Sequence, residues 1–367
     1  MKCALVTKYG ARGDYDEMLV MSEECDKPQA QAGFLVLRVQ AACLAPGDVR
    51  VASGWTTFVQ TPPGGLPYVP GGDVVGVVVE EDQSARKFKL GDCVVARFHG
   101  NGPHGALAEF ARVKSSLAAV KPVGISTPQA AAIPSSPVVA LRVAQAWVKP
   151  GDRCLVIGGT GGVGSHLVQL LKGAGASYVA ATASTQNVTL LETALRSSVD
   201  RAIDREKENF WEIAEFKSAP FDVLFDLAAP SKVWLHALAV LKSGWQGGRF
   251  VTLVGPEFHY KMQSAWQVLR VAKRVALDGF GTWLRPWLPR YSWWLGGLDD
   301  PIEDETWQRV FDLVRTGELR IILDPEGPFP FSEQGVRDAF RLQATRHARG
   351  KVVVAVDDFA GQNDVRA

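Results

Sequence analysis

The fold is decided by the stretch Cys154–Leu155–Val156–Ile157–Gly158–Gly159–Thr160–Gly161–Gly162–Val163–Gly164. An apolar run ends in glycines, and the helical pattern Ser165–His166–Leu167–Val168–Gln169–Leu170–Leu171 begins at once, which is typical of a strand, a tight turn and a helix. Gly159, Gly161 and Gly164 have the G-x-G-x-x-G spacing of a dinucleotide-binding turn. Glycine there permits the tight turn, lets the backbone approach a pyrophosphate, and lets the helix pack closely on the strand. We therefore expect a nucleotide site whose backbone contacts also include Gly158, Thr160, Gly162 and Val163. A purely structural strand–turn–helix would look similar.

The end of the next predicted strand, 178–183, indicates which nucleotide is bound. Sites for NAD usually place an acidic residue there, whereas this chain has Ser184, Thr185, Gln186 and Asn187. Hydroxyl and amide groups can donate to a 2′-phosphate, which a carboxylate would repel. Arg205, which follows Ala202–Ile203–Asp204, is placed to reach the adenosine end. The pattern favours NADPH over NADH, and it is compatible with Ser184 and Thr185 capping the next helix.

Bulk composition excludes several function classes. A length of 367 residues suggests two domains, and a net charge of +1 gives no electrostatic argument for nucleic acid. No run of eighteen apolar residues is present, and the N-terminus reads as a strand without a signal or transit segment, which predicts a cytoplasmic protein with a mitochondrial location as the alternative. The five cysteines have no C-x-x-C spacing and predict free thiols rather than disulfides or a zinc knuckle. His99 and His104 share a loop that would hold a metal only with further ligands.

The pattern changes along the chain. Residues 1–125 read as short strands separated by Gly- and Pro-rich turns, which predicts an antiparallel, barrel-like β domain. From 126 onward, strand candidates at 154–157, 178–183, 222–226 and 249–254 alternate with helical segments, which predicts a parallel sheet with crossover helices. The tail returns to the first style with a strand at 350–356.

Several ordered blocks resemble the medium-chain dehydrogenase/reductase superfamily, in its zinc-free quinone oxidoreductase branch. They are found at 68–78, 88–94, 105–110, 158–164, 221–226 and 348–352. The segments 329–332, 338–340 and 346–352 look like the reticulon-4-interacting protein group, whose members are mitochondrial NADPH oxidoreductases linked to ubiquinone metabolism. The resemblance implies an α/β fold: a Rossmann doubly wound parallel sheet plus an N-terminal antiparallel β (GroES-like) domain. It places the GroES-like domain at 1–125, completed by 320–367, and the NADPH-binding domain at 126–319, with a Trp-rich insertion near 277–298.

Departures from the family pattern bear on the chemistry. Zinc-dependent relatives carry a Cys ligand where this chain has Ala45 and a His ligand where it has Gly72, so we expect no zinc. The quinone and enoyl reductase branches usually have Asn in place of Ala45 and often Tyr in place of Trp55, and an indole is not a practical acid. A Thr that commonly faces the nicotinamide is replaced by Val139.

These residues predict hydride transfer from NADPH to a quinone or a similar conjugated carbonyl. The alternatives are an enoyl-thioester reductase and a non-catalytic NADPH-binding module. Asp48 and Tyr68 are candidate catalytic groups, although Asp48 is as well suited to anchoring backbone and Tyr68 to packing beside prolines. Val254 and Gly255 should lie beside the nicotinamide, at the carboxyl end of a strand. Lys351 is either a cofactor contact or a surface lysine before an edge strand.

The segment 277–298 contains four tryptophans with Arg285 and Arg290 between them. Three interpretations are open: a pocket wall in which Trp283 contacts substrate beside Trp55, Tyr68 and Val139, a peripheral membrane contact, or a dimer contact or lid. We also expect that the chain forms a homodimer through an outer sheet edge.

Overall fold

The computed structural model describes residues 1–10, 14–62, 64–81, 87–97, 105–228, 232–254, 261–294 and 301–357. The chain divides into two compact units, one made of Met1–Val138 with Gly297–Ala367 and the other of Val139–Gly296. These limits differ from the expected 125/126 and 319/320. Helix α3 (Thr127–Ala132) packs on strands of the first unit, and Asp304, at the start of α10 (Asp304–Arg315), pairs with Lys87 of that unit.

The first unit is built around an antiparallel sheet, and β1 and β2 form a separate pair beside it. The strands of this unit are β1 (Cys3–Val6), β2 (Leu19–Ser22), β3 (Phe34–Leu44), β4 (Asp73–Glu81), β5 (Cys93–Arg97), β6 (Phe110–Lys114), β7 (Ala118–Val120), β14 (Phe329–Pro330) and β15 (Val352–Ala355). Its helices, besides α3 and α10, are α1 (Tyr15–Met18), α2 (Pro46–Ala52), η1 (Ser115–Leu117) and α11 (Glu333–Thr345). The long strand β3 pairs with β4, β6 and β15, so the C-terminal strand completes the sheet, as the sequence predicted.

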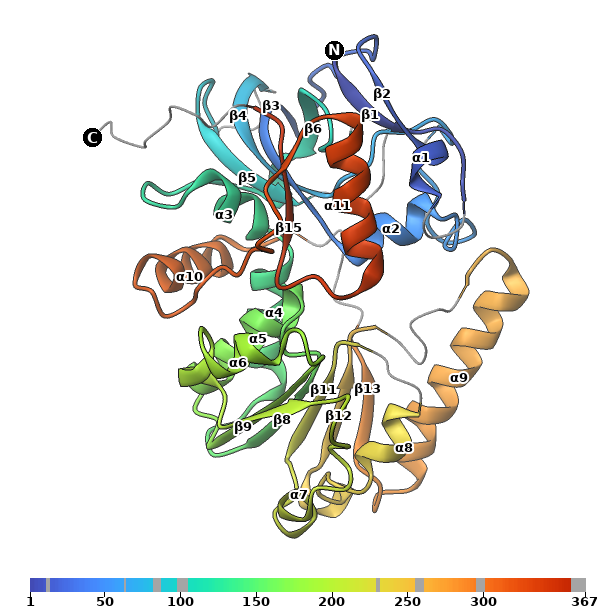
Figure 1. Ribbon diagram of the computed structural model, residues 1–367, viewed down its shortest axis with the longest axis vertical. Coiled ribbons are helices and arrows are strands. Elements are labelled where there is room, and N and C mark those ends of the chain that lie inside the picture. The colour runs from blue at the N-terminus through green and yellow to red at the C-terminus, as the bar shows by residue number, and fades with distance from the viewer. Residues whose placement is uncertain are drawn as a thin grey trace. The chain divides into compact units, whose positions relative to one another are not determined.

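The sheet has the strand order β14-β15-β3-β4-β5-β7, with β6 also paired to β3 (Figure 1). Alternate residues of β3, such as Leu35 and Leu37, enter a core that also holds Phe340 of α11. Each fully buried side chain of this kind contributes about 1.5–3 kcal/mol relative to an exposed one. The expected antiparallel β domain is confirmed.

The second unit is a parallel sheet with crossover helices. Its strands are β8 (Arg153–Ile157), β9 (Tyr178–Ala183), β10 (Arg201–Asp204), β11 (Val223–Asp226), β12 (Arg249–Thr252) and β13 (Arg290–Trp293). Its helices are α5 (Gly162–Gly173), α6 (Val188–Glu192), η2 (Arg196–Ser198), α7 (Ala214–Ser218), α8 (Val233–Ala237), η3 (Gly244–Gln246) and α9 (Ala265–Leu284), while α4 (Ser136–Trp147) begins in the first unit.

The strand order β10-β9-β8-β11-β12-β13 is that of a doubly wound nucleotide-binding fold, with every strand parallel (Figure 1). The order reverses between β8 and β11, which places a topological switch point directly after Ile157. The expected fold class is confirmed. The segment 277–298, expected as an insertion, supplies the end of α9 and the edge strand β13.

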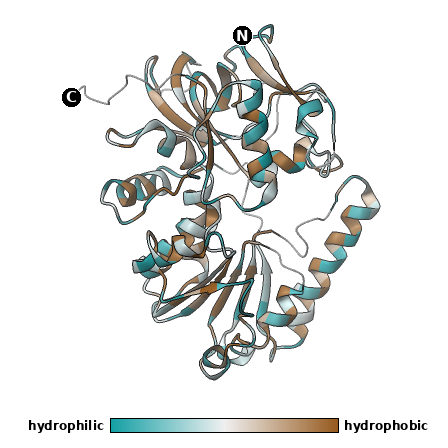
Figure 2. Ribbon diagram, viewed as in Figure 1, coloured by the Kyte–Doolittle hydropathy of each residue, from teal (hydrophilic) through white to brown (hydrophobic). Residues whose placement is uncertain are grey.

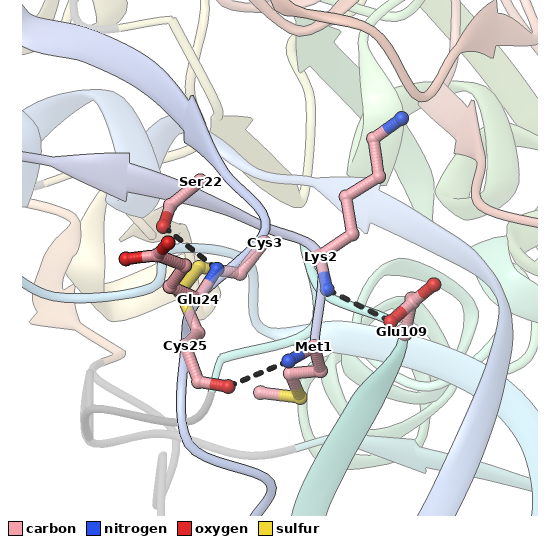
Figure 3. The surroundings of a disulfide bond; sticks show 7 residues. All are labelled: Met1, Lys2, Cys3, Ser22, Glu24, Cys25 and Glu109. Carbon is pink, nitrogen blue, oxygen red and sulfur yellow. Dashed lines mark hydrogen bonds between the residues drawn. A yellow bond between two sulfur atoms is a disulfide. The ribbon is translucent and has the colours of Figure 1, made fainter.

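The cysteine prediction is wrong for one pair. Cys3 and Cys25 form a disulfide, because the β1–β2 hairpin sets Cys3 opposite Ser22 and the chain then turns back to Met1 (Figure 3). The amino group of Met1 donates to the Cys25 carbonyl at 2.7 Å, and the Cys25 N–H returns a bond to Met1 at 3.1 Å. Cys43 and Cys154 are buried free thiols, as expected. Among the helices of the described chain, none is both long and apolar enough to cross a membrane.

Candidate functional site

The glycine turn lies where β8 ends and α5 begins. Gly158 has φ +89°, a conformation that favours glycine, and its N–H donates to the hydroxyl of Thr182 on β9 at 3.1 Å. A Cβ added to Gly159 would lie 2.7 Å from the Ala181 Cβ. A Cβ on Gly164 would collide with the Gly158 carbonyl oxygen, so only glycine lets α5 pack this closely on the turn.

Gly161 differs from the other glycines because nothing in the protein requires it. It precedes α5 with φ −75°, which any residue adopts, and an added Cβ would meet no atom nearer than the Gly158 oxygen at 3.7 Å. The space beside it is therefore open on the side where the first-turn N–H groups of α5 have no intrahelical acceptors. A methyl group at Gly161 would occupy this open space. The space and the N–H groups beside it fit a pyrophosphate.

The predicted adenosine end gathers at the carboxyl edge of β9 and β10. Ser184 and Asn187 are buried, and the Arg205 N–H bonds the Ala183 carbonyl at 2.9 Å, which holds exposed Arg205 beside Ser184. The N-cap residue of α6 is Asn187, so neither Ser184 nor Thr185 occupies the capping position that the sequence suggested.

An acidic residue that sequence reasoning did not weigh lies at the same edge. The Thr185 hydroxyl donates to Asp204 at 2.9 Å, and Lys207 pairs with the same carboxylate at 3.2 Å. Burial would raise the pKa of Asp204, but the Glu206 N–H, Thr185 and Lys207 outweigh it and lower this pKa. The charge of Asp204 is thus already matched by Lys207. A contact between Arg205 and a 2′-phosphate stays a prediction.

The carboxyl ends of β11 and β12 carry a buried polar pair that the sequence did not single out. The Thr252 hydroxyl donates to Asp226 at 3.2 Å, and the Ala228 N–H donates to the same carboxylate at 3.2 Å. Val254 follows β12 at this edge, as predicted, whereas Gly255 lies outside the described residues. The pair fixes the strand ends next to the glycine turn.

In the first unit, Asp48 holds backbone at the start of α2. Its carboxylate accepts the Ala45 N–H at 2.7 Å, which satisfies an N–H at the start of that helix. The pKa of Asp48 is raised to about 6, because burial and the nearby charge of Asp73 outweigh the hydrogen bond from Ala45 and the charge of Lys351. The anchoring role expected for Asp48 is therefore observed, and a proton-accepting role at neutral pH is compatible with it.

Tyr68 is the candidate with an uncommitted polar group. Its side chain is buried, and its hydroxyl has no hydrogen-bond partner among the residues that the structure describes. Burial and then the charge of Asp48 raise the pKa of Tyr68 well above its usual value, so the phenol keeps its proton. A buried hydroxyl without an acceptor is costly unless a ligand supplies one. Trp55 is partly buried, and its backbone N–H donates to the Arg50 carbonyl at 3.1 Å.

Lys351 is neither an exposed lysine nor a free one. Its ammonium lies 3.1 Å from Asp73 and donates to the Leu44 carbonyl at 3.3 Å, with both charged side chains buried. The Ser135 hydroxyl donates to the other Asp73 oxygen. Burial would lower the pKa of Lys351, but the neighbouring negative charge of Asp73 outweighs it and raises this pKa. The surface interpretation is wrong, and a cofactor contact stays a prediction.

The donor set does not fit zinc. Ala45 offers a methyl group and Gly72 no side chain at the two positions where zinc-dependent relatives place ligands. Within the described ranges, no group of three His, Cys, Asp or Glu side chains could hold a metal ion. His99 and His104 lie outside those ranges. We derive no step through a metal.

Two predicted substrate residues belong to the second unit. Val139 is partly buried near the start of α4. Trp283 is 72% exposed on α9, so the described residues of its own unit do not bury it. Its predicted contact with substrate stays a prediction.

Comparisons with known proteins agree with this geometry. The alcohol dehydrogenase GroES-like domain family matches residues 31–123, and the zinc-binding dehydrogenase family matches residues 198–354. The chain is 32% identical to the chloroplastic NADPH-dependent alkenal/one oxidoreductase of Arabidopsis thaliana, over 96% of this chain and 79% of that protein. It is 30% identical to the mitochondrial NAD(P)H oxidoreductase RTN4IP1 of Bos taurus, over 97% of this chain and 89% of that protein. The solved quinone oxidoreductase of Coxiella burnetii matches with a TM-score of 0.75 and 26% identity, over 97% of this chain and 99% of that one.

Proposed function

We propose that this chain, which belongs to the medium-chain dehydrogenase/reductase superfamily, is an NADPH-dependent reductase of quinones and conjugated carbonyls. Its relatives are named for alkenal/one and quinone oxidation–reduction and for NADPH. The observation that carries the proposal is the open cradle at Gly161, which the fold preserves although no protein contact requires glycine there. The reductase is zinc-independent because the side chains at the ligand positions cannot coordinate a metal.

The chain's own groups account for binding of the cofactor. The first-turn N–H groups of α5 bind the pyrophosphate, and Ser184 and Arg205 bind the 2′-phosphate. When bound, NADPH supplies a hydride to the substrate. The buried Asp226–Thr252 pair holds the carboxyl ends of β11 and β12, the edge of the sheet that would bind the nicotinamide.

Reduction of a conjugated carbonyl places negative charge on the carbonyl oxygen before a proton arrives. The Tyr68 hydroxyl is a buried donor without an acceptor in the described protein, so it is suited to bond that oxygen. Because burial, and then the charge of Asp48, raise the Tyr68 pKa, the phenol acts as a hydrogen-bond donor that stabilises charge, and water supplies the proton. Trp55 takes no proton role in this scheme.

The proposal is tested by following NADPH absorbance with the full chain and three acceptors: a 2-alkenal, a para-quinone and a crotonyl thioester, with NADH as the cofactor control. Consumption that is selective for NADPH and for the alkenal or quinone supports it. Selective turnover of the thioester would favour an enoyl-thioester reductase. Tight NADPH binding without turnover of any acceptor would favour a binding module.

Tyr68→Phe tests the hydrogen bond to the substrate oxygen. Loss of one positioned donor should lower kcat about a hundredfold while leaving the NADPH Kd and the melting temperature unchanged. Tyr15→Phe is the matched control, because Tyr15 is equally buried in the same unit and packs on Phe340. Equal kcat values for both variants and the wild type would remove Tyr68 from the mechanism.

Two further predictions concern assembly and location. Strand β13 pairs with β12 on one side and, within the described residues, with no strand on the other, which supports a homodimer through that edge. A cytoplasmic location stays a prediction, since the named relatives are chloroplastic and mitochondrial.

A further inference from the structure

Helix α9 carries an apolar stripe that the described residues of its own unit leave uncovered. Residues three or four positions apart lie on one face of a helix. On α9 one such row, with Trp283 beside it, is here called the outer face of α9, and it consists of Trp266, Leu269, Lys273, Leu277, Phe280, Trp283 and Leu284. All seven are exposed, and the six apolar ones are each more than half exposed. Such a continuous exposed apolar face marks an interaction surface.

The opposite side of α9 is the side that attaches the helix to its unit. Val268, Val271 and Val275 are partly buried, and buried Thr282 accepts the Tyr291 N–H of β13 at 3.3 Å. The helix extends beyond the sheet from this attachment, and apolar and polar positions alternate along it (Figures 1 and 2). Because folding uses the valine side, the outer face is not required for the core of the unit.

The surroundings of the outer face are strongly basic although the whole chain is nearly neutral. Residues 261–290 contain six Lys or Arg and one acidic residue, whereas the chain has a net charge of +1. The acidic residue, Asp278, is paired with Arg274 at 2.9 Å. Arg270 borders the outer face and Lys273 stands within it, both exposed.

We propose that the outer face of α9 binds the surface of an anionic phospholipid bilayer, lying in the plane of the interface. Tryptophan, phenylalanine and leucine on one face with basic residues in and beside it suit the boundary between acyl chains and anionic headgroups. The binding is peripheral and does not depend on the proposed reductase activity.

The charge of the outer face favours an anionic bilayer over a second copy of the chain as its partner. A two-fold contact places the same patch against itself, so the basic residues Lys273 and Arg270 of both copies would be brought into one apolar interface. Like charges so placed oppose association, whereas headgroup phosphates neutralise them. The basic residues therefore favour the anionic surface.

The test is flotation of the full-length protein with two kinds of vesicle, pure phosphatidylcholine and phosphatidylcholine with about one third phosphatidylglycerol. We expect binding to the anionic vesicles at ~0.1 M salt and its loss at ~1 M salt, because the charges are then screened. Phe280→Ser and Lys273→Glu should each lower the partition coefficient about tenfold, and the double variant more. Free inorganic phosphate should not compete, because the apolar residues need acyl chains.

Matched controls make the result specific to α9. Phe58→Ser removes a Phe of similar exposure from the first unit, and Lys217→Glu reverses an exposed charge on α7. Both should bind vesicles like the wild type, and all variants should keep the wild-type melting temperature. The proposal is overturned if the wild type ignores anionic vesicles at low salt, binds neutral and anionic vesicles equally, or binds them equally well with Phe280 and Lys273 replaced. It is also overturned if light scattering shows a wild-type dimer that these α9 variants convert to a monomer.

Discussion

Replacing Gly161 with alanine should weaken NADPH binding while leaving the fold intact. The residue has φ −75° and ψ 177°, which alanine adopts freely, and its new methyl would meet nothing nearer than 3.7 Å. The cost to folding is limited to the preference of this helix-start position for glycine over alanine, about 1 kcal/mol. The methyl would, however, occupy the space through which the pyrophosphate reaches the backbone. Loss of one N–H bond to a charged group costs about 1.5–3 kcal/mol, which raises the NADPH Kd about tenfold to a hundredfold.

Gly164→Ala is the matched comparison, because the same methyl at Gly164 should damage the fold. The added Cβ would collide with the Gly158 carbonyl oxygen and lie 3.0 Å from the Gly159 Cα, so the turn must move. Overpacking of this kind costs about 1–3 kcal/mol or more. Circular dichroism melts and NADPH fluorescence titrations separate the two effects. If Gly161→Ala binds NADPH as tightly as the wild type, the turn does not hold the pyrophosphate. If Gly164→Ala melts like the wild type, our account of the packing is wrong.

Three further predictions follow from charged groups. Lys351→Met should destabilise the chain by about 3–5 kcal/mol in urea unfolding because it leaves Asp73 buried and unpaired, and adding Asp73→Leu should recover part of the loss; an additive double variant would contradict the ion pair. The Asp48 pKa of about 6 lies above its ordinary 3.8, so the folded state holds this proton more tightly than the unfolded state. The protonated carboxyl therefore contributes about 3 kcal/mol to stability below about pH 4, and this contribution is lost as the pH rises through 6. Asp48→Asn should flatten that part of the stability–pH curve, and an unchanged curve would reject the assignment. Arg205→Ala should raise the NADPH Kd about tenfold and leave the NADH Kd unchanged, with Lys217→Ala as a control that changes neither.

The nucleotide-binding turn could be predicted from the sequence because its requirements are local. Gly158 needs a positive φ, and Gly159 and Gly164 are each forced by an atom that lies within a few ångströms of the turn. Such constraints act on single residue types at fixed spacing, and they leave a readable pattern. The strand order of the second unit then follows from the alternation of strands and helices.

Elements with weak local patterns were missed. Strand β10 is Arg201–Asp204, in which Ile203 is the one fully buried apolar residue, and β13 lies among tryptophans and arginines that obscure its alternation. Both strands form because a neighbouring strand of the sheet offers its backbone hydrogen bonds, and that partner is not visible in either segment.

Long-range pairs were beyond sequence reasoning for the same reason. Lys351 and Asp73 stand 278 residues apart and meet because β15 and β4 both pair with β3. Cys3 meets Cys25 through a hairpin whose spacing matches no cysteine motif.

The same distinction between local and long-range information explains why the cofactor-binding residues could be predicted from the sequence better than the substrate-binding residues. The cofactor half depends on glycines, whose role is steric and local, so family pattern and physical requirement coincide. In our proposal the substrate half depends on Tyr68, whose buried hydroxyl has no partner in the described structure and lies near the charge of Asp48, a property of packing rather than of residue type. The sequence marks Tyr68 as a candidate catalytic group, but its position beside prolines does not show that the hydroxyl lacks a partner. A sequence pattern can therefore identify the glycine turn, whereas the proposed role of Tyr68 follows from the burial and charge around one donor, which only the folded structure shows.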